Sequence, residues 1–431
     1  MAATRKEKTE FEARPSFGID AAAYGLLILG VAWLFFDSFI VVHSIYTDVP
    51  LIRIAVQCVK WFMLIAPPLI LILHFGIDWK WLSILLFYLG LIFFYSIIAY
   101  LNGYSFDNIM LSLKNTYFWL FYFIYICVPR FKAPASVIRF VILAIFFGAL
   151  LNVLYSVYVG LTFDGNLERF YFYSLYDQKG MFEDWNFIRD GAVRAFGYVG
   201  SKLTLSQLLL IPISVAVMLF FGVKSEGGRT AVFLFLIVLG YGLYLTKTRN
   251  PILAISCAIC VSLFFRYKLQ GWGVVLFFSI FTSVYGLTIY LVFFISDIGW
   301  GDLSSQARVP LLISFLEVMR DQPLGYGVGS TGIYNLNYRF FFESSASTVF
   351  NELGVVGGAI YWCGVLSIVV VILNNASSQA SVYMRAILRG VALSILALLF
   401  LTNFSNIFDS SLLVFSIIAA LSVKCRATIS L

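Results

Sequence analysis

Residues 384–402 read MRAILRGVALSILALLFLT, and this stretch decides the fold class. Two arginines, Arg385 and Arg389, stand near its start, and the rest of the stretch carries no charge. An α-helix needs about 20 apolar residues to cross the hydrocarbon layer of a bilayer. The stretch therefore predicts a membrane-spanning helix with its basic end at one surface.

The same pattern recurs along the whole chain. Gly, Pro, Asn or charged residues separate apolar segments of similar length, which predicts about twelve spans. We place them at 19–42, 51–74, 81–101, 108–128, 135–160, 199–222, 229–246, 250–267, 272–296, 346–373, 384–402 and 406–423. The chain is 61% hydrophobic and 12% charged, against roughly 25% charged residues in soluble domains. The expected fold is an all-α integral membrane protein.

Basic residues predict the orientation. With the N-terminus inside, the inner short segments hold sixteen Lys and Arg residues and the outer ones hold five. Those five are Arg53, Lys60, Lys114, Lys247 and Arg249. Because cytoplasmic loops carry the excess of Lys and Arg, both termini are expected in the cytoplasm. This rule explains the net charge of +7, and no basic stripe predicts nucleic acid as a partner.

Two long segments divide one membrane domain into three groups of spans. Residues 1–160 hold five expected spans, 199–296 hold four, and 346–431 hold three. Segments 161–198 and 297–345 are expected on the outer face as periplasmic loops.

The two loops differ in character. The first is rich in aromatic residues and carboxylates, and Tyr173 and Trp185 are candidates for stacking on sugar rings. An interfacial aromatic belt is the alternative interpretation. The second loop contains an amphipathic stretch from Gln306 to Asp321, which predicts a helix along the membrane surface.

Charged residues inside spans point to a polar site. A charge in hydrocarbon costs at least about 2.5 kcal/mol, yet Asp37, Lys60, Lys114 and Asp409 fall in expected spans. All lie in the expected outer half, which predicts a polar cavity that opens outward. Salt bridges or placement at the interface are the alternatives.

A short outer turn, Thr246-Lys-Thr-Arg-Asn-Pro251, adds two cations. A guanidinium binds phosphate through two parallel hydrogen bonds. Lys247 and Arg249 are therefore candidates for holding an anionic lipid headgroup, with ordinary phospholipid contact as the alternative.

Four short elements, taken together, resemble the O-antigen polymerase and ligase superfamily of bacterial surface-glycan enzymes. They are Arg194-Ala-Phe-Gly197 before a span, Thr248-Arg249 at the outer turn, Arg308 through Pro323-Leu-Gly-Tyr-Gly-Val-Gly329, and Glu343-Ser-Ser with Asn351-Glu352-Leu-Gly-Val-Val-Gly357. The resemblance covers residues 190–360 and the overall topology.

The resemblance implies a fold and a chemistry. The fold is a GT-C-like glycosyltransferase architecture. The enzyme transfers glycan on the periplasmic face from an undecaprenyl-diphosphate-linked oligosaccharide, which serves as donor and acceptor among the membrane lipids. The resemblance implies no cofactor and no metal, and it leaves open whether a chain-length regulator protein binds.

Roles for single residues follow from the resemblance. A diphosphate leaving group needs cations, and Arg194, Arg249 and Arg308 are the candidates. The acceptor hydroxyl needs a base within hydrogen-bond reach, and Glu343 is the candidate. Glu352 is a rival for this role, but it lies deeper in the span and is expected to organise the structure around Gly354.

Three functions compete. Ligases of this superfamily typically carry His at the position of Glu343, usually followed by Asn, where this chain has Ser344. This departure favours a polymerase of lipid-linked repeats. A ligase that moves finished glycan onto lipid A-core is the second interpretation. A transporter or flippase of lipid-linked glycan is the third, although no repeat of two halves is visible.

Overall fold

The computed structural model describes residues 17–37, 39–40, 50–128, 135–162, 188–189, 192–199, 201–248, 250–263, 272–297, 313, 315–317, 319–331, 344–402 and 409–425. Its α-helices are α1 (Phe17–Leu34), α3 (Pro50–Phe75), α4 (Trp79–Leu101), α5 (Phe106–Ser112), α6 (Ala135–Thr162), α8 (Lys202–Gly222), α9 (Glu226–Leu245), α10 (Asn250–Leu263), α11 (Trp272–Asp297), α13 (Ser345–Ser378), α14 (Val382–Leu401) and α15 (Asp409–Lys424).

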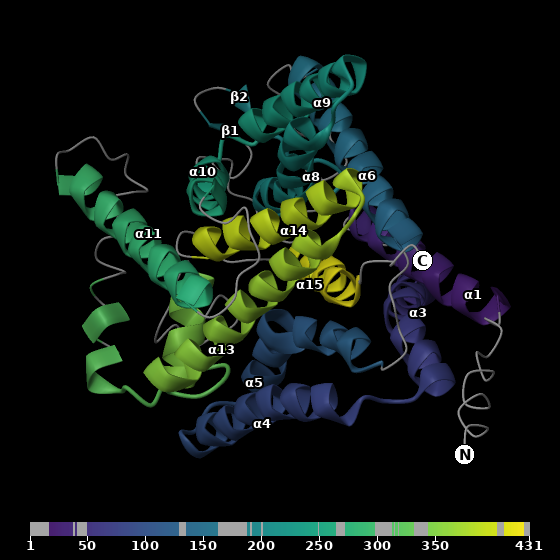
Figure 1. Ribbon diagram of the computed structural model, residues 1–431. Helices are drawn as coiled ribbons and strands as arrows, with labels where there is room; N and C mark the ends of the chain where they lie inside the picture. Colours follow the sequence, from purple (N-terminus) through teal and green to yellow (C-terminus); the bar gives the residue numbers. More distant parts are fainter. Residues whose placement is uncertain are drawn as a thin grey trace, which may run out of the picture.

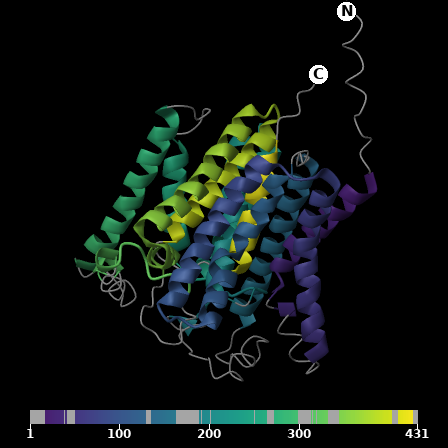
Figure 2. The same ribbon diagram turned by 90° about the horizontal axis from the view of Figure 1, so that it is seen from below.

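Every expected span overlaps a helical segment, which agrees with a membrane protein. Seven described helices are long and apolar enough to cross a bilayer, and they lie in α3, α4, α6, α8, α9, α13 and α14. Shorter apolar helices lie in α1, α10, α11 and α15. In Figure 2 the long helices run largely side by side. The number of crossings stays a prediction, because among the described residues seven helices, and not twelve, are both long and apolar enough to cross. The orientation stays a prediction as well.

Helix α14 forms the centre of the bundle. It packs against α8, α10, α13 and α15, as Figure 1 shows. In the apolar stretch of α14, 89% of the residues are buried inside the protein, whereas in the apolar stretch of α9 only 17% are buried. A helix that is apolar all round must be covered by other helices or by lipid. The exposed Phe233, Leu234 and Ile237 of α9 therefore form a face suited to lipid.

The expected span 108–128 is not a regular α-helix. It begins as α5, continues as a π-helix, η1 (Leu113–Tyr117), and ends as a 3-10 helix, η2 (Phe118–Cys127). The prediction of a plain spanning helix is therefore wrong in its geometry. A π-helical turn is rare and frequently marks a functional site.

The first long loop contains a small antiparallel sheet. Strand β1 (Ile188–Arg189) pairs with β2 (Ala192–Val193), with Ile188 opposite Val193. Most of this loop lies outside the described residues. In the second loop, the described residues 315–317 and 319–321 are helical, which agrees with the expected amphipathic helix.

Candidate functional site

Helix α13 contains a break at Gly354, where the backbone adopts φ 68° and ψ −178°. The N–H of Val355 leaves the helix and donates to the carbonyl of Pro323 at 2.9 Å. The carbonyl of Asn351, which an unbroken helix would use for Val355, accepts the N–H of Tyr326 at 2.9 Å. The break thus lets a distant segment hydrogen-bond to the backbone of α13.

This distant segment, residues 323–331, is called the glycine segment below. Gly325, Gly327 and Gly329 have φ of 81°, 97° and 86°, a region that side chains with a Cβ rarely adopt. The N–H of Gly327 donates to the carbonyl of Glu352 at 3.0 Å. A Cβ at Gly329 would lie 2.8 Å from the carbonyl oxygen of Asn108 in α5. The glycines therefore allow the segment to be buried between α4, α5 and α13.

The carboxylate of Glu352 lies where these elements meet, and the residue has no exposed surface. The hydroxyl of Tyr117 donates to Oε2 at 2.8 Å, and the N–H of Gly329 donates to Oε1 at 2.9 Å. The hydroxyl of Ser112 lies 3.1 Å from Oε1, and that of Thr331 lies 3.3 Å from Oε1. These five residues are called the Glu352 cluster.

The π-helix explains why Ser112 and Tyr117 reach the same carboxylate. In an α-helix of 3.6 residues per turn, two residues five apart point roughly 140° away from each other. A π-helix bonds residue i to i+5, so residues five apart come to lie above one another. The irregular turn thereby aligns both hydroxyls with Glu352.

A second cluster surrounds Arg194, which is 8% exposed. Its Nε donates to the carbonyl of Thr246 at 3.2 Å, and its Nη2 donates to that of Lys247 at 3.5 Å. The N–H of Ala195 donates to the carbonyl of Leu245 at 2.9 Å. Carbonyls at a helix C-terminus carry partial negative charge, so the guanidinium stabilises the end of α9 and fixes the turn that leads to Arg249.

The chain after Arg194 packs against α1 and α6. Gly197 has φ 57°, and it lies against the buried side chain of Asn152. The N–H of Phe39 donates to the carbonyl of Tyr198 at 3.1 Å, and the ring of Tyr198 stacks on Tyr155 with centroids 4.4 Å apart. The end of α1 is therefore held beside the Arg194 cluster.

The charged pair Asp37 and Lys60 joins α3 to the end of α1. The ammonium of Lys60 forms an ion pair with Asp37, and Trp33 donates to the same carboxylate at 3.2 Å. Lys60 is 8% exposed and lies 5.4 Å from the ring centre of Trp61. Of the two interpretations of these buried charges, the structure supports the salt bridge for this pair.

Two of the other predicted site residues are described by the structure, and five are not. Lys114 is exposed on the π-helix, and Lys247 is half-buried with φ 51°. Glu343, Arg249, Arg308, Tyr173 and Trp185 lie outside the described residues.

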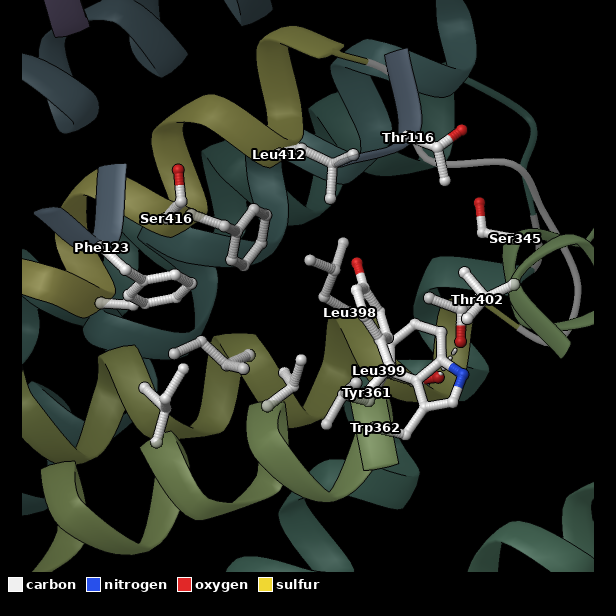
Figure 3. Close-up of a pocket in the computed structure, with 16 residues that line it drawn as sticks. Thr116, Phe123, Ser345, Tyr361, Trp362, Leu398, Leu399, Thr402, Leu412 and Ser416 are labelled. Atoms are coloured by element: carbon white, nitrogen blue, oxygen red, sulfur yellow. Dashed lines mark hydrogen bonds between the residues drawn. The ribbon is translucent and has the colours of Figure 1, made fainter. Parts of the chain in front are cut away.

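Beside the Glu352 cluster lies a pocket of about 70 Å³ between η1, η2, α13, α14 and α15. Figure 3 shows Thr116, Ser345 and Thr402 at one end of it and Phe123 at the other. The indole nitrogen of Trp362 is buried and has no hydrogen-bond partner among the described residues. The end with Thr116, Ser345 and Thr402 carries three hydroxyl groups and is called the mouth below; the remaining walls are mostly apolar, with Ser416 near the other end.

Only part of this arrangement can be predicted from the sequence. Glu352 stands out as a carboxylate in an apolar segment, and the glycines stand out by their spacing. Ser112, Tyr117 and Thr331 carry no such signal, because their roles depend on a π-helix and on a contact between segments more than 200 residues apart.

No curated protein and no solved structure matches the chain. Residues 232–361 match the model of the O-antigen ligase family. The matched part contains the turn at Arg249, the glycine segment and Glu352, whereas Arg194 and the π-helix lie before it. This match confirms the resemblance to the O-antigen ligase and polymerase superfamily.

Proposed function

We propose that this protein polymerises undecaprenyl-diphosphate-linked oligosaccharide repeats into O-antigen or a related surface polysaccharide. The growing chain is the donor, and a sugar hydroxyl of a new lipid-linked repeat is the acceptor. The single observation that carries the proposal is the family match over residues 232–361, which indicates a function of the O-antigen ligase or polymerase type. The absence of His at position 343 favours the polymerase.

Cations near the leaving group form the first part of the proposed mechanism. Arg249 binds the diphosphate through its planar guanidinium, with Arg308 and Lys247 as further contacts. Arg194 takes a share in this role by holding the turn before Arg249, since its guanidinium already bonds to the carbonyls of Thr246 and Lys247. Arg249 therefore binds the diphosphate directly, and Arg194 acts by positioning Arg249.

The acceptor side forms the second part. Glu343 takes the proton of the attacking hydroxyl as general base. Tyr173 and Trp185 stack on sugar rings, and the exposed Lys114 contacts the anionic substrate. The ammonium of Lys60 is already paired with Asp37. Lys60 therefore contributes to the site by holding α3 to the end of α1.

The pocket of Figure 3 suits the lipid part of the substrate. Its interior is formed by Val349, Ile368, Leu398 and other apolar side chains, and its mouth carries hydroxyl groups. An isoprenoid chain buries branched hydrocarbon in such a space and leaves its oxygen end at the mouth. We assign the pocket to the first isoprene units of the carrier.

The proposed setting is the bacterial inner membrane, with both termini in the cytoplasm. The three groups of spans, 1–160, 199–296 and 346–431, then form one membrane domain. The loops 161–198 and 297–345 lie on the periplasmic side, where the lipid-linked repeats and any chain-length regulator protein meet the enzyme.

Deletion of the gene, followed by gel analysis of surface glycan, tests the proposal. Loss of a polymerase leaves a single repeat on the acceptor. Loss of a ligase leaves no repeat on the acceptor, and loss of a flippase makes repeats accumulate inside the cell. Only the first pattern is consistent with a polymerase. The intact gene on a plasmid should then restore the long-chain glycan.

A further inference from the structure

The carboxylate of Glu352 is buried without a basic partner among the described residues. Its hydrogen bonds come from three hydroxyls and one backbone N–H. An ionised carboxylate has about four acceptor sites, so these donors can fill all of them. Burial of a charge is unfavourable unless it is hydrogen-bonded. The buried carboxylate is therefore best explained as a structural group that joins the segments carrying its hydrogen-bond donors.

The donors belong to two segments that are far apart in the sequence. Ser112 ends α5 directly before the π-helical turn, Tyr117 is the last residue of that turn, and Gly329 and Thr331 lie in the glycine segment. Glu352 is thus a bridge: Gly329 and Thr331 bond to Oε1, Tyr117 bonds to Oε2, and Ser112 lies within 3.2 Å of both oxygens. Apart from the bridge, the backbone bonds of Tyr326 and Gly327 to α13 and of Val328 to Tyr95 in α4 hold the glycine segment as far as Val328.

The π-helical turn has two more faces. Lys114 points to the exposed side, and Thr116 lines the mouth of the pocket. Figure 3 shows Thr116 opposite Ser345 across this mouth. Tyr117 also contacts Tyr361, another wall residue, with ring centroids 5.9 Å apart. A shift of the turn would therefore change the mouth as well as the cluster.

We propose that Glu352 is a positioning residue: its carboxylate locks the π-helical turn to the glycine segment and so fixes Thr116 at the mouth of the pocket. It acts through Ser112 and Tyr117 and touches no substrate. The role depends on hydrogen bonding by the side chain, so an amide of the same size can replace the acid. The consequence for catalysis rests on the proposed function, but the lock itself does not.

Hydrogen exchange measured by mass spectrometry on the full-length protein in detergent tests the lock without any activity. Glu352→Ala should speed exchange at least about tenfold in both 112–117 and 325–331, because both segments lose their shared partner. Glu352→Gln should keep exchange in both segments within about threefold of wild type, because its oxygen accepts from Gly329 while the hydroxyls rotate to accept from its nitrogen. Glu317→Gln, an exposed acid changed in the same way, is the matched control.

Two further variants test whether a change in one of the two segments alters hydrogen exchange in the other. Ser112→Ala should loosen 325–331, and Thr331→Val should loosen 112–117, although neither substitution lies in the segment that responds. If Glu352→Ala does not fold, Tyr117→Phe removes one 2.8 Å bond and keeps the ring. Protection unchanged in the distant segment for these variants would overturn the lock, as would a Glu352→Gln protein that exchanges like Glu352→Ala.

Kinetics with purified lipid-linked repeats test the effect on the site. Glu352→Ala should raise KM about tenfold with a smaller change in kcat, and Glu352→Gln should restore KM, since a displaced mouth weakens binding. A KM of Glu352→Ala equal to wild type would refute the link to the pocket. If wild type joins no repeats, the proposed function fails, and the exchange measurements still decide on the lock.

Discussion

The backbone N–H of Val355 donates to the carbonyl of Pro323 at 2.9 Å, across a gap of more than thirty residues in the sequence. The break at Gly354 makes this bond possible, because it turns the N–H away from the helix axis. The two elements joined here, the glycine segment and the start of α13, belong to two of the four elements that carry the family resemblance. Their contact is formed by backbone groups. It therefore depends on the glycines, whose positive φ allows the two backbones to approach, more than on any side chain.

Gly354→Ala should destabilise the protein by about 1–3 kcal/mol, because Ala is strained at φ 68° and its Cβ would meet the backbone of Leu324. The free energy of unfolding in detergent is the measurement. Gly90→Ala on α4 is the control, because no atom lies within 4 Å of the added Cβ. A Gly354→Ala protein as stable as the Gly90→Ala protein would contradict the strained break.

Arg249→Lys should abolish long-chain glycan, because the ammonium keeps the charge and loses the two-pronged geometry for phosphate. Arg194→Ala should do the same by releasing the turn before Arg249. Glycan length on gels, at equal protein levels, is the measurement, and Arg320→Lys at an exposed site is the control. Wild-type chain lengths in Arg249→Ala would rule out the diphosphate role.

Glu343→Gln should slow the joining of lipid-linked repeats at least about a hundredfold, because general-base catalysis contributes 10²–10⁴-fold. Glu343→Asp should retain more activity than Glu343→Gln. Single-turnover rates of purified protein are the measurement, with Glu317→Gln as the control. A rate within a few-fold of wild type would mean that the carboxylate caps the following helix or contacts a sugar.

Ala419→Leu should fill the apolar end of the pocket with three added carbon atoms. Because every isoprenoid carrier has the first isoprene units that we assign to the pocket, we expect KM to rise for a long carrier and for a carrier of few units alike. The expected rise is about tenfold, the scale of mismatches in apolar pockets. Ala231→Leu on the exposed side of α9 is the control. A KM unchanged for both carriers would argue against a lipid site.

Cysteines at positions 174 and 335 test the orientation. In a background free of other cysteines, Ser174→Cys and Asn335→Cys should both react with a membrane-impermeant reagent added to intact cells with a permeable outer membrane. Ser225→Cys, between α8 and α9 on the predicted inner side, should stay unmodified until the cells are broken. Protection of position 174 or 335 would reverse the assignment.

The sequence by itself determined the membrane class and the position of the helices. A span needs a long apolar run, and such a run is a local property that one segment displays without its neighbours. The run at 384–402 predicted α14 (Val382–Leu401) almost residue for residue. The glycines at 325, 327 and 329 are also visible in the sequence, and they permit an unusual backbone because only glycine adopts positive φ readily.

Only the tertiary structure decided which segments meet. The apolar pattern of 108–128 could not show a π-helix, because that turn is stabilised by Glu352, more than 230 residues further on. The same holds for Arg194, whose partners are carbonyls at the end of α9. Hydrogen bonds between distant segments depend on where the bundle packs, and packing between α14 and its neighbours is a property of the whole chain.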